Sequence, residues 1–201
     1  EKILYSQLSL AKAGFSTGGR APYGFRRWLV NVDGQMLREL TEGERVRMAG
    51  HHVVWMPVAD DHPDMRTIRR ILESLETTPA SRVAALLTTE GVPTPDAGRS
   101  RKDSGIRHET SGVWHATTIV NIARNPLLRA IVAYGRRSMG DQQRFEANGP
   151  RGLSVDDFRA DGRPKVIRND PIAMVTADAK FTSLVDSTRH ENLLHTLDQR
   201  G

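Results

Sequence analysis

Glycine and proline residues divide this chain into short segments, and they limit the length of every helix or strand. Gly14 ends a helical pattern at the start of the chain, and Gly91 to Pro95 (GVPTP) ends another. Asn125-Pro126 ends a third, because proline cannot continue a helix. Asp33-Gly34 lies between two strand-like runs, which is typical of a hairpin. The sequence therefore predicts an α+β fold with a small antiparallel sheet or hairpin and short helices.

Apolar periodicity and capping residues place the remaining elements. Apolar residues recur at helical spacing from Met65 to Leu75, and Thr78-Pro79 is typical of a helix start with threonine as the N-cap. The stretch 96–112 is polar and predicts a loop. The predicted elements are helices over 1–13, 65–75, 79–90 and 115–124, a final helix capped by Thr176, strands over 25–32, 35–40, 52–58 and 127–134, and a loop-rich segment over 138–164.

Composition excludes several classes of protein. The chain has no cysteine, so disulfides and cysteine-ligated zinc are excluded. It has no apolar run of about 18 residues, so no membrane-spanning helix is expected and a cytoplasmic location fits. The first residues, EKILYSQLSL, lack the apolar core of a signal peptide and contain no initiator Met, which indicates a fragment of a longer protein.

The net charge of +5 is distributed unevenly. Residues 12–38 carry five basic side chains against one acidic, whereas residues 39–64 carry two against six. A cationic face opposite an acidic one is typical of a polyanion binder. The alternative is a GC-rich genome that favours arginine, because only five of the 29 basic residues are lysine. Charge alone leaves both interpretations open.

The predicted helix over 115–124 separates apolar from polar residues. Ala116, Ile119, Val120, Ile122 and Ala123 fall on one side, and the opposite side carries hydroxyls, amides and one arginine but no acid. Such side chains can reach base edges in a major groove. A surface helix solvated by neutral polar residues explains the same pattern, and the helix alone does not decide between the two.

Four motifs in order resemble the recombinase domain of large serine recombinases, the phage-integrase and transposon family. They are Pro22-Tyr23-Gly24-Phe25, Gly91 to Pro95, the helix-opening Trp114 and the helix-closing Asn125-Pro126. Leu127 to Ala130 departs from the Tyr-x-Gly that usually follows in this family. The stretches 39–64 and 96–112 are longer than usual, and the acidic first one is expected to lie away from DNA.

The resemblance implies a helix-turn-helix-like DNA-binding core preceded by the end of a long helix. The chain would hold this domain without the family's catalytic serine domain or zinc ribbon, so it is not expected to be an enzyme or to hold a cofactor itself. Zinc would belong only to the absent ribbon. The implied divisions are residues 1–14 as the connecting helix, 15–24 as a linker strap, 25–175 as the DNA-binding domain with 39–64 and 96–112 as insertions or loops, and 176–201 as a helix leading toward the ribbon.

The partner implied by the resemblance is double-stranded DNA, with the parent protein a dimer on DNA and a tetramer in synapsis. Arg20 would enter the minor groove, while the helix over 115–124 would read the major groove. The remaining cations would hold phosphates. For Tyr23 the sequence leaves two roles open, packing against the protein and contact with a phosphate. The predicted contact residues are Arg20, Tyr23, Arg26, Arg27, Arg99, Arg101, Lys102, His115, Thr117, Thr118, Asn121, Arg124, Arg136 and Arg137.

Two alternatives remain. A helix-turn-helix transcription regulator would share the helices but form a self-sufficient dimer without a catalytic region. A metal-dependent hydrolase would use His51, His52 and His62 with the neighbouring aspartates. We disfavour the metal site because adjacent histidines on a strand point to opposite faces. Trp28, Trp55 and Trp114 are isolated and are expected to pack in the core rather than stack on bases.

Overall fold

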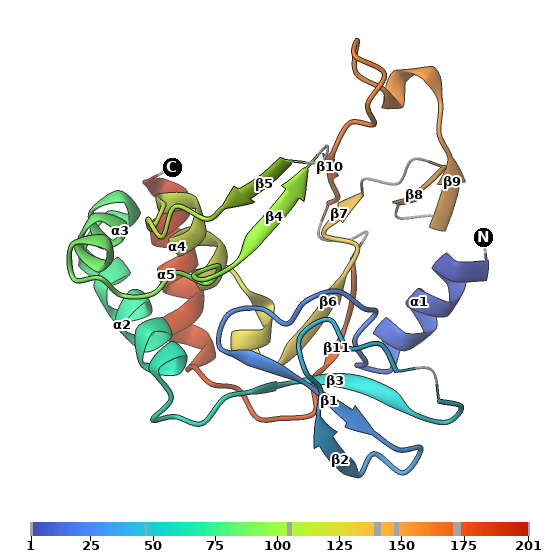
Figure 1. Cartoon of the computed structure of the whole chain (residues 1–201), viewed down its shortest axis with the longest axis horizontal. Helices are drawn as coiled ribbons and strands as arrows, with labels where there is room; N and C mark the ends of the chain where they lie inside the picture. The colour runs from blue at the N-terminus through green and yellow to red at the C-terminus, as the bar shows by residue number, and fades with distance from the viewer. Residues whose placement is uncertain are drawn as a thin grey trace. The chain divides into compact units, whose positions relative to one another are not determined.

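The computed structural model describes residues 2–46, 48–103, 106–138, 142–146, 149–170 and 174–200, without the side chains of residues 2, 3, 101–103 and 106–108. The fold is mixed α+β with small antiparallel sheets, as predicted (Figure 1). The chain divides into two compact units. Unit 1 comprises residues 1–21, 26–56 and 129–184, and unit 2 comprises residues 22–25, 57–128 and 185–201.

A three-stranded sheet with the order β2-β1-β3 forms much of unit 1. β1 (Phe25–Val30) and β2 (Met36–Glu39) are antiparallel, with Trp28 opposite Glu39. In the turn between them, the side-chain oxygen of Asn31 accepts the backbone N–H groups of Asp33 and Gln35. This confirms the hairpin predicted from Asp33-Gly34. β3 (His52–Pro57) is the third strand, also as predicted.

The second sheet of unit 1 corrects one prediction. β6 (Ile131–Tyr134) pairs in antiparallel fashion with β11 (Val175–Asp178), so a strand occupies the position where Thr176 was expected to cap a helix. α1 (Lys2–Lys12) lies against both strands, and the Tyr134 hydroxyl donates a 2.8 Å hydrogen bond to Gln7. The pairing buries Val132 and satisfies the backbone of Thr176, and these contacts outweigh the local capping signal.

Short strands also occur in the segment over 138–164 that was expected to be mainly loop. They are β8 (Gln143–Glu146) and β9 (Gly149–Gly152), with the 3-10 turn η2 (Val155–Asp157). β7 (Arg137–Ser138) lies at the start of this segment, and its partner β10 (Ile167–Arg168) follows it. β8 and β9 pair with each other, and β7 pairs with β10.

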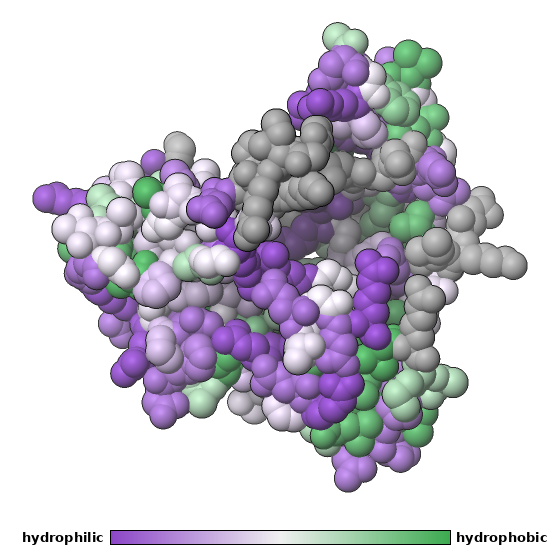
Figure 2. Space-filling view, viewed as in Figure 1, coloured by the Kyte–Doolittle hydropathy of each residue, from purple (hydrophilic) through white to green (hydrophobic). Residues whose placement is uncertain are grey.

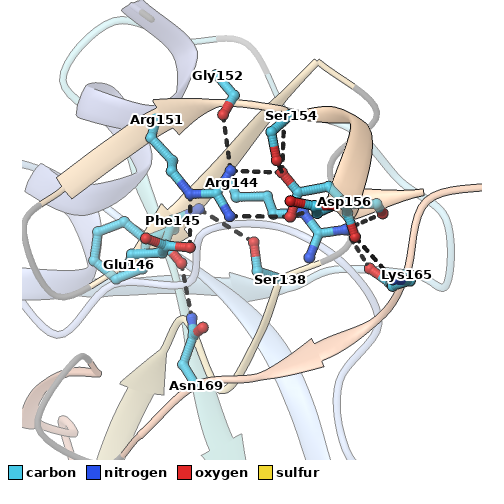
Figure 3. A network of polar contacts seen from close by, with 11 residues as sticks. Ser138, Arg144, Phe145, Glu146, Arg151, Gly152, Ser154, Asp156, Lys165 and Asn169 are labelled. Carbon is cyan, nitrogen blue, oxygen red and sulfur yellow. Dashed lines mark hydrogen bonds and ion pairs between the residues drawn. The ribbon is translucent and has the colours of Figure 1, made fainter.

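An ionic cluster links β8, β9 and η2 (Figure 3). Arg151 donates to both carboxylate oxygens of Asp157, at 2.6 and 3.0 Å, and to Glu146 at 2.8 Å. Arg144 is fully buried, and its guanidinium donates to the backbone oxygens of Asp157 and Lys165. We call Arg144, Glu146, Arg151 and Asp157 the Asp157 cluster. Arg151 and the backbone N–H of Ser154 lower the pKa of Asp157.

The lowered pKa predicts a pH dependence of this segment. Because the carboxylate is favoured in the folded state, Asp157 stabilises the fold above the ordinary aspartate pKa of about 4. That contribution is lost as the pH falls from there toward the lowered folded-state pKa. The protection factors of the β8 and β9 amides, corrected for the intrinsic exchange rate at each pH, should therefore fall from pH 6 to pH 3 relative to those of α2. In Asp157→Asn these amides should exchange fast already at pH 6, and equal protection in both proteins would contradict the assignment.

Unit 2 is mainly helical. Its helices are α2 (Pro63–Thr77), α3 (Ala80–Thr89), α4 (Ala116–Ala123) and α5 (Ser187–Gln199), and the 3-10 turn η1 (Pro126–Arg129) follows α4. The predicted helix over 65–75 is confirmed within α2. The buried apolar residues of the four helices are Met65, Ile68, Ile71, Leu75, Val83, Ala84, Leu87, Ile119, Ile122, Ala123, Leu193 and Leu197.

The ends of these helices differ from the prediction. Thr78 is extended and forms the C-cap of α2, while Pro79 occupies the N-cap position of α3 without a side-chain hydrogen bond. The last helix begins at Ser187, where the Asp186 carboxylate accepts the backbone N–H of Arg189 at 2.8 Å. The strand predicted over 127–134 is half correct, because η1 occupies its first residues.

The polar stretch 96–112 contains a hairpin of β4 (Ser100–Asp103) and β5 (Ile106–Glu109) rather than only a loop. This hairpin lies in the connection between α3 and α4, although the two helices contact each other. A helix-turn-helix normally has a turn of 3–4 residues. The helix-turn-helix-like core therefore stays a prediction.

The surface is mostly polar in the view of Figure 2, with apolar residues gathered over the three-stranded sheet. Val32 and Leu37 are exposed there. None of the helices in the described ranges combines the length and apolar composition that a membrane span needs.

Candidate nucleic-acid interface

The Pro22-Tyr23-Gly24-Phe25 motif forms a tight turn within unit 2. The Phe25 N–H donates to the Pro22 carbonyl at 3.0 Å, and the Phe25 ring is buried. Gly24 has φ +80°, and a Cβ atom there would lie 2.3 Å from the Cδ1 atom of Ile68 in α2. The motif therefore needs glycine for both its backbone conformation and its contact with α2. Gly18 and Gly19, also at positive φ, have open space around the position of a Cβ.

Trp114 fixes the start of α4. Its ring is buried, its indole N–H donates to the Val92 carbonyl at 2.8 Å, and its backbone N–H donates to the Thr88 hydroxyl at 3.0 Å. The Tyr23 ring meets it edge-on, with the ring centroids 6.0 Å apart. Three of the four motifs thus meet around one indole. The core placement predicted for Trp114 is confirmed, whereas Trp28 and Trp55 are half-buried.

The separation of polar from apolar residues on α4 is also confirmed. Ile119, Ile122 and Ala123 are buried, while Thr117, Asn121 and the preceding His115 are exposed. Thr118 and Arg124 are half-buried. The exposed side of α4 offers hydroxyl and amide groups without a carboxylate of its own.

A pocket of about 240 Å³ lies along one edge of α4, within unit 2. Thr118, Asn121, Ile122 and Asn125 line it from the helix, at the spacing of a single helical stripe. The other walls come from the Pro22 turn, α2, the end of the GVPTP turn and η1; they are Pro22, Tyr23, Phe25, Ile68, Pro95 and Leu128. The structure thus brings together three predicted contact residues, Tyr23, Thr118 and Asn121.

Arg124, at the end of α4, forms an ion pair with Asp198 of α5. The two residues are 74 positions apart in the sequence, and no local pattern could have indicated the pair. In this arrangement the Asp198 carboxylate pairs with the guanidinium that was predicted to contact DNA.

Three predicted contact residues of unit 1, Arg20, Arg26 and Arg27, interact with the acidic stretch. Arg20 pairs with Glu42 at 3.1 Å, and Arg26 lies 3.9 Å from Glu39. Arg27 donates to the backbone oxygen of Glu44 at 2.9 Å. Residues 39–44 therefore lie against these arginines, and the expectation that the acidic stretch lies away from DNA stays a prediction.

Glu44 anchors this acidic stretch. Arg38 donates to its carboxylate, and the N–H and hydroxyl of Thr41 donate to the same group. The hydrogen bonds from Arg38 and then Thr41 lower the pKa of Glu44 to about 2, so this carboxylate stays charged even at a pH where an ordinary glutamate is protonated. Glu44 therefore has a charged carboxylate, paired with Arg38, and a backbone oxygen that binds Arg27.

The remaining predicted contacts belong to other elements of the two units. Arg99 donates to the Pro95 carbonyl at 2.9 Å and to Asp96, and it is partly buried. Arg136 and Arg137 are exposed at β7 of unit 1. Arg101 and Lys102 belong to β4, but their side chains lie outside the described residues.

Charge differs between the two units. Unit 1 contains 18 lysine and arginine residues against 12 acidic ones, whereas unit 2 contains 11 against 12. The positive surplus of the chain therefore belongs to unit 1. The uncharged groups suited to base edges belong to α4 of unit 2.

The residues considered for a metal site have other contacts. His52 stacks on Phe15 with ring centroids 4.2 Å apart, His62 caps α2 by accepting the Asp64 N–H, and Asp60 pairs with Arg69. Among the described residues no group of three or more histidine or acidic side chains is arranged to hold a metal ion. Sequence reasoning also missed the Asp157 cluster, whose members are linked by strand pairing rather than by a motif.

A comparison with protein-family models finds no match to this chain, and a comparison with curated protein sequences finds none either.

Gly24→Ala tests the packing of the turn. The substitution forces an L residue into a positive φ and places a methyl group against Ile68, so we expect unfolding to become easier by about 3 kcal/mol. Gly19→Ala is the matched control, because it has a similar φ but open space, and should cost about 1 kcal/mol. Urea denaturation measures both, and equal losses would show that the contact with Ile68 is unimportant.

Asp198→Asn tests whether the ion pair competes with DNA. An exposed pair contributes up to about 1 kcal/mol, so freeing Arg124 should tighten duplex binding by about 2- to 5-fold at low salt. Asp61→Asn, which makes the same charge change at an exposed aspartate before α2, is the control. Fluorescence anisotropy with a labelled duplex measures both. Equal affinities of the two variants would mean that Asp198 does not compete with DNA.

Proposed function

We propose that this chain is a duplex-DNA-binding module of the large serine recombinase type. The observation that carries the proposal is α4, whose exposed side presents His115, Thr117 and Asn121 without an acid. Its start is held by the tryptophan that also contacts the Tyr23 turn. Hydroxyl and amide groups on an exposed helix suit hydrogen bonding to base edges in a major groove.

The cations of unit 1 would supply the contacts that do not depend on base sequence. Arg20 follows two glycines at positive φ and is about half exposed, with a side-chain exposure of 55%. A guanidinium on such a segment suits the negative potential of a narrow minor groove. Arg26, Arg136 and Arg137 would hold phosphates. Because Arg20 and Arg26 are paired with carboxylates, binding would exchange these pairs for phosphate contacts.

The parent protein would be a recombinase acting in the cytoplasm as a DNA-bound dimer and a synaptic tetramer. Its catalytic serine and its zinc ribbon would belong to other domains.

The test begins with selection of binding sites from a random-sequence duplex pool. Affinity for the selected site is then measured by anisotropy over a range of salt concentrations. Asn121→Ala should weaken binding by about 10-fold or more, because a bidentate amide–base contact contributes about 1–3 kcal/mol. Asn192→Ala, which truncates an exposed asparagine on α5, is its control.

Arg20→Ala should weaken binding to all sequences and reduce the salt slope by about one. Its control is Arg163→Ala, because Arg163 is 82% exposed in a loop of unit 1 and is not among the predicted contacts. If the pool yields no preferred sequence and the chain binds no duplex at low salt, the proposal is wrong. If Asn121→Ala binds as tightly as Asn192→Ala, α4 is not the reading helix.

A further inference from the structure

The pocket beside α4 is lined by uncharged residues, although the proposed function places this surface against DNA. Six of its lining residues are apolar or proline, and four are polar but uncharged. No lysine, arginine, aspartate or glutamate lines it. It therefore lacks the cations that suit phosphate or guanine oxygens and the carboxylates that suit the cytosine amino group.

The walls are held in place before any ligand binds. Phe25 and Ile68 are each only 1% exposed, and Gly24 brings the turn against Ile68. The Asn125 side-chain oxygen accepts the backbone N–H of Leu127 at 3.2 Å, which orients its carboxamide. Tyr23 is positioned by its edge contact with Trp114. A preformed pocket loses little entropy when it is filled.

We infer that this pocket receives the 5-methyl group of a thymine, so that α4 selects an A·T pair at this position. The inference rests on the proposed DNA-binding function. In the major groove the thymine methyl is the apolar group that distinguishes base edges, and adenine offers the N6 donor and N7 acceptor that match a carboxamide. Asn121 is exposed and also lines the pocket, so one residue adjoins both the methyl and the amide contact.

The size of the pocket agrees with this ligand. A volume of about 240 Å³ lies below the range of about 300–1,000 Å³ that is usual for pockets enclosing whole small molecules. A methyl group with the adjoining edge of its ring enters such a space while the base stays in the stack. Burial of one methyl contributes about 0.8 kcal/mol, or about a 4-fold change in affinity.

The experiment replaces thymine with uracil, which lacks only this methyl group. A duplex selected from the random pool is resynthesised with deoxyuridine at each thymine in turn, and the dissociation constants are measured. We expect one or two positions within the site to show about a 4-fold weaker affinity. Uracil at thymines outside the protected footprint is the control for altered DNA flexibility.

A protein variant connects this effect with the pocket. Thr118→Ile adds bulk at the rim, and it should reduce the thymine-to-uracil difference to below 2-fold. Thr89→Ile, which makes the same change at an exposed position on α3, should retain it, and circular dichroism verifies that both variants fold.

The outcomes separate the two proposals. Equal affinity for thymine and uracil at every position overturns the pocket assignment while leaving specific DNA binding intact. A uracil effect that persists in Thr118→Ile also overturns it, because the methyl would then be read elsewhere. Failure to bind or select any duplex instead overturns the proposed function on which the inference rests.

Discussion

The indole of Trp114 is the contact on which the helical unit depends. The indole N–H bonds the Val92 carbonyl and the backbone N–H of the same residue bonds the Thr88 hydroxyl, so Trp114 joins the start of α4 to the end of α3 across a connection that contains a hairpin. The edge of Tyr23 rests on the same ring, which places the Pro22 turn beside α4. A smaller residue at position 114 would leave the Val92 carbonyl without the indole donor and remove the ring that Tyr23 contacts, whereas the backbone bond to Thr88 could remain. The positions of the pocket, the exposed side of α4 and the Pro22 turn therefore all depend on Trp114.

Sequence patterns predicted the helices and strands that are determined by residues close together in the sequence. The Asp33-Gly34 hairpin, the apolar stripe of α2 and the two-sided α4 depend on residues a few positions apart, and each is present. β11 was missed because its partner β6 lies about forty residues earlier, and pairing outweighed the capping signal of Thr176. Among the candidate contacts, exposure on α4 was predictable from periodicity. The pairs Arg124–Asp198 and Arg20–Glu42 were not, because only the tertiary fold brings them together.

Because of these ion pairs, the predicted contact arginines do not form a purely cationic surface. Acidic residues 39–44 lie among the arginines of unit 1, and Asp198 lies at the end of α4 in unit 2. Each carboxylate lowers the gain from placing a phosphate at the same guanidinium. Such competition penalises contacts that rely on charge alone more than contacts that add base-specific hydrogen bonds. Under the proposed function, these ion pairs would both weaken non-specific binding and sharpen discrimination between sequences.

The division into two units also has a consequence for how the chain is made. The backbone passes between the units five times, and α5, which completes unit 2, is synthesised only after residues 129–184 of unit 1. Neither unit is a continuous stretch, so neither can be excised by cutting the chain once. In the folded chain Arg200 and His190 form hydrogen bonds with the backbone carbonyls of Leu75 and Ala123. On the ribosome, α2, α3 and α4 would emerge long before α5 packs against them. Their apolar stripe would stay open during that interval, which makes the last helix a late and aggregation-sensitive step of folding.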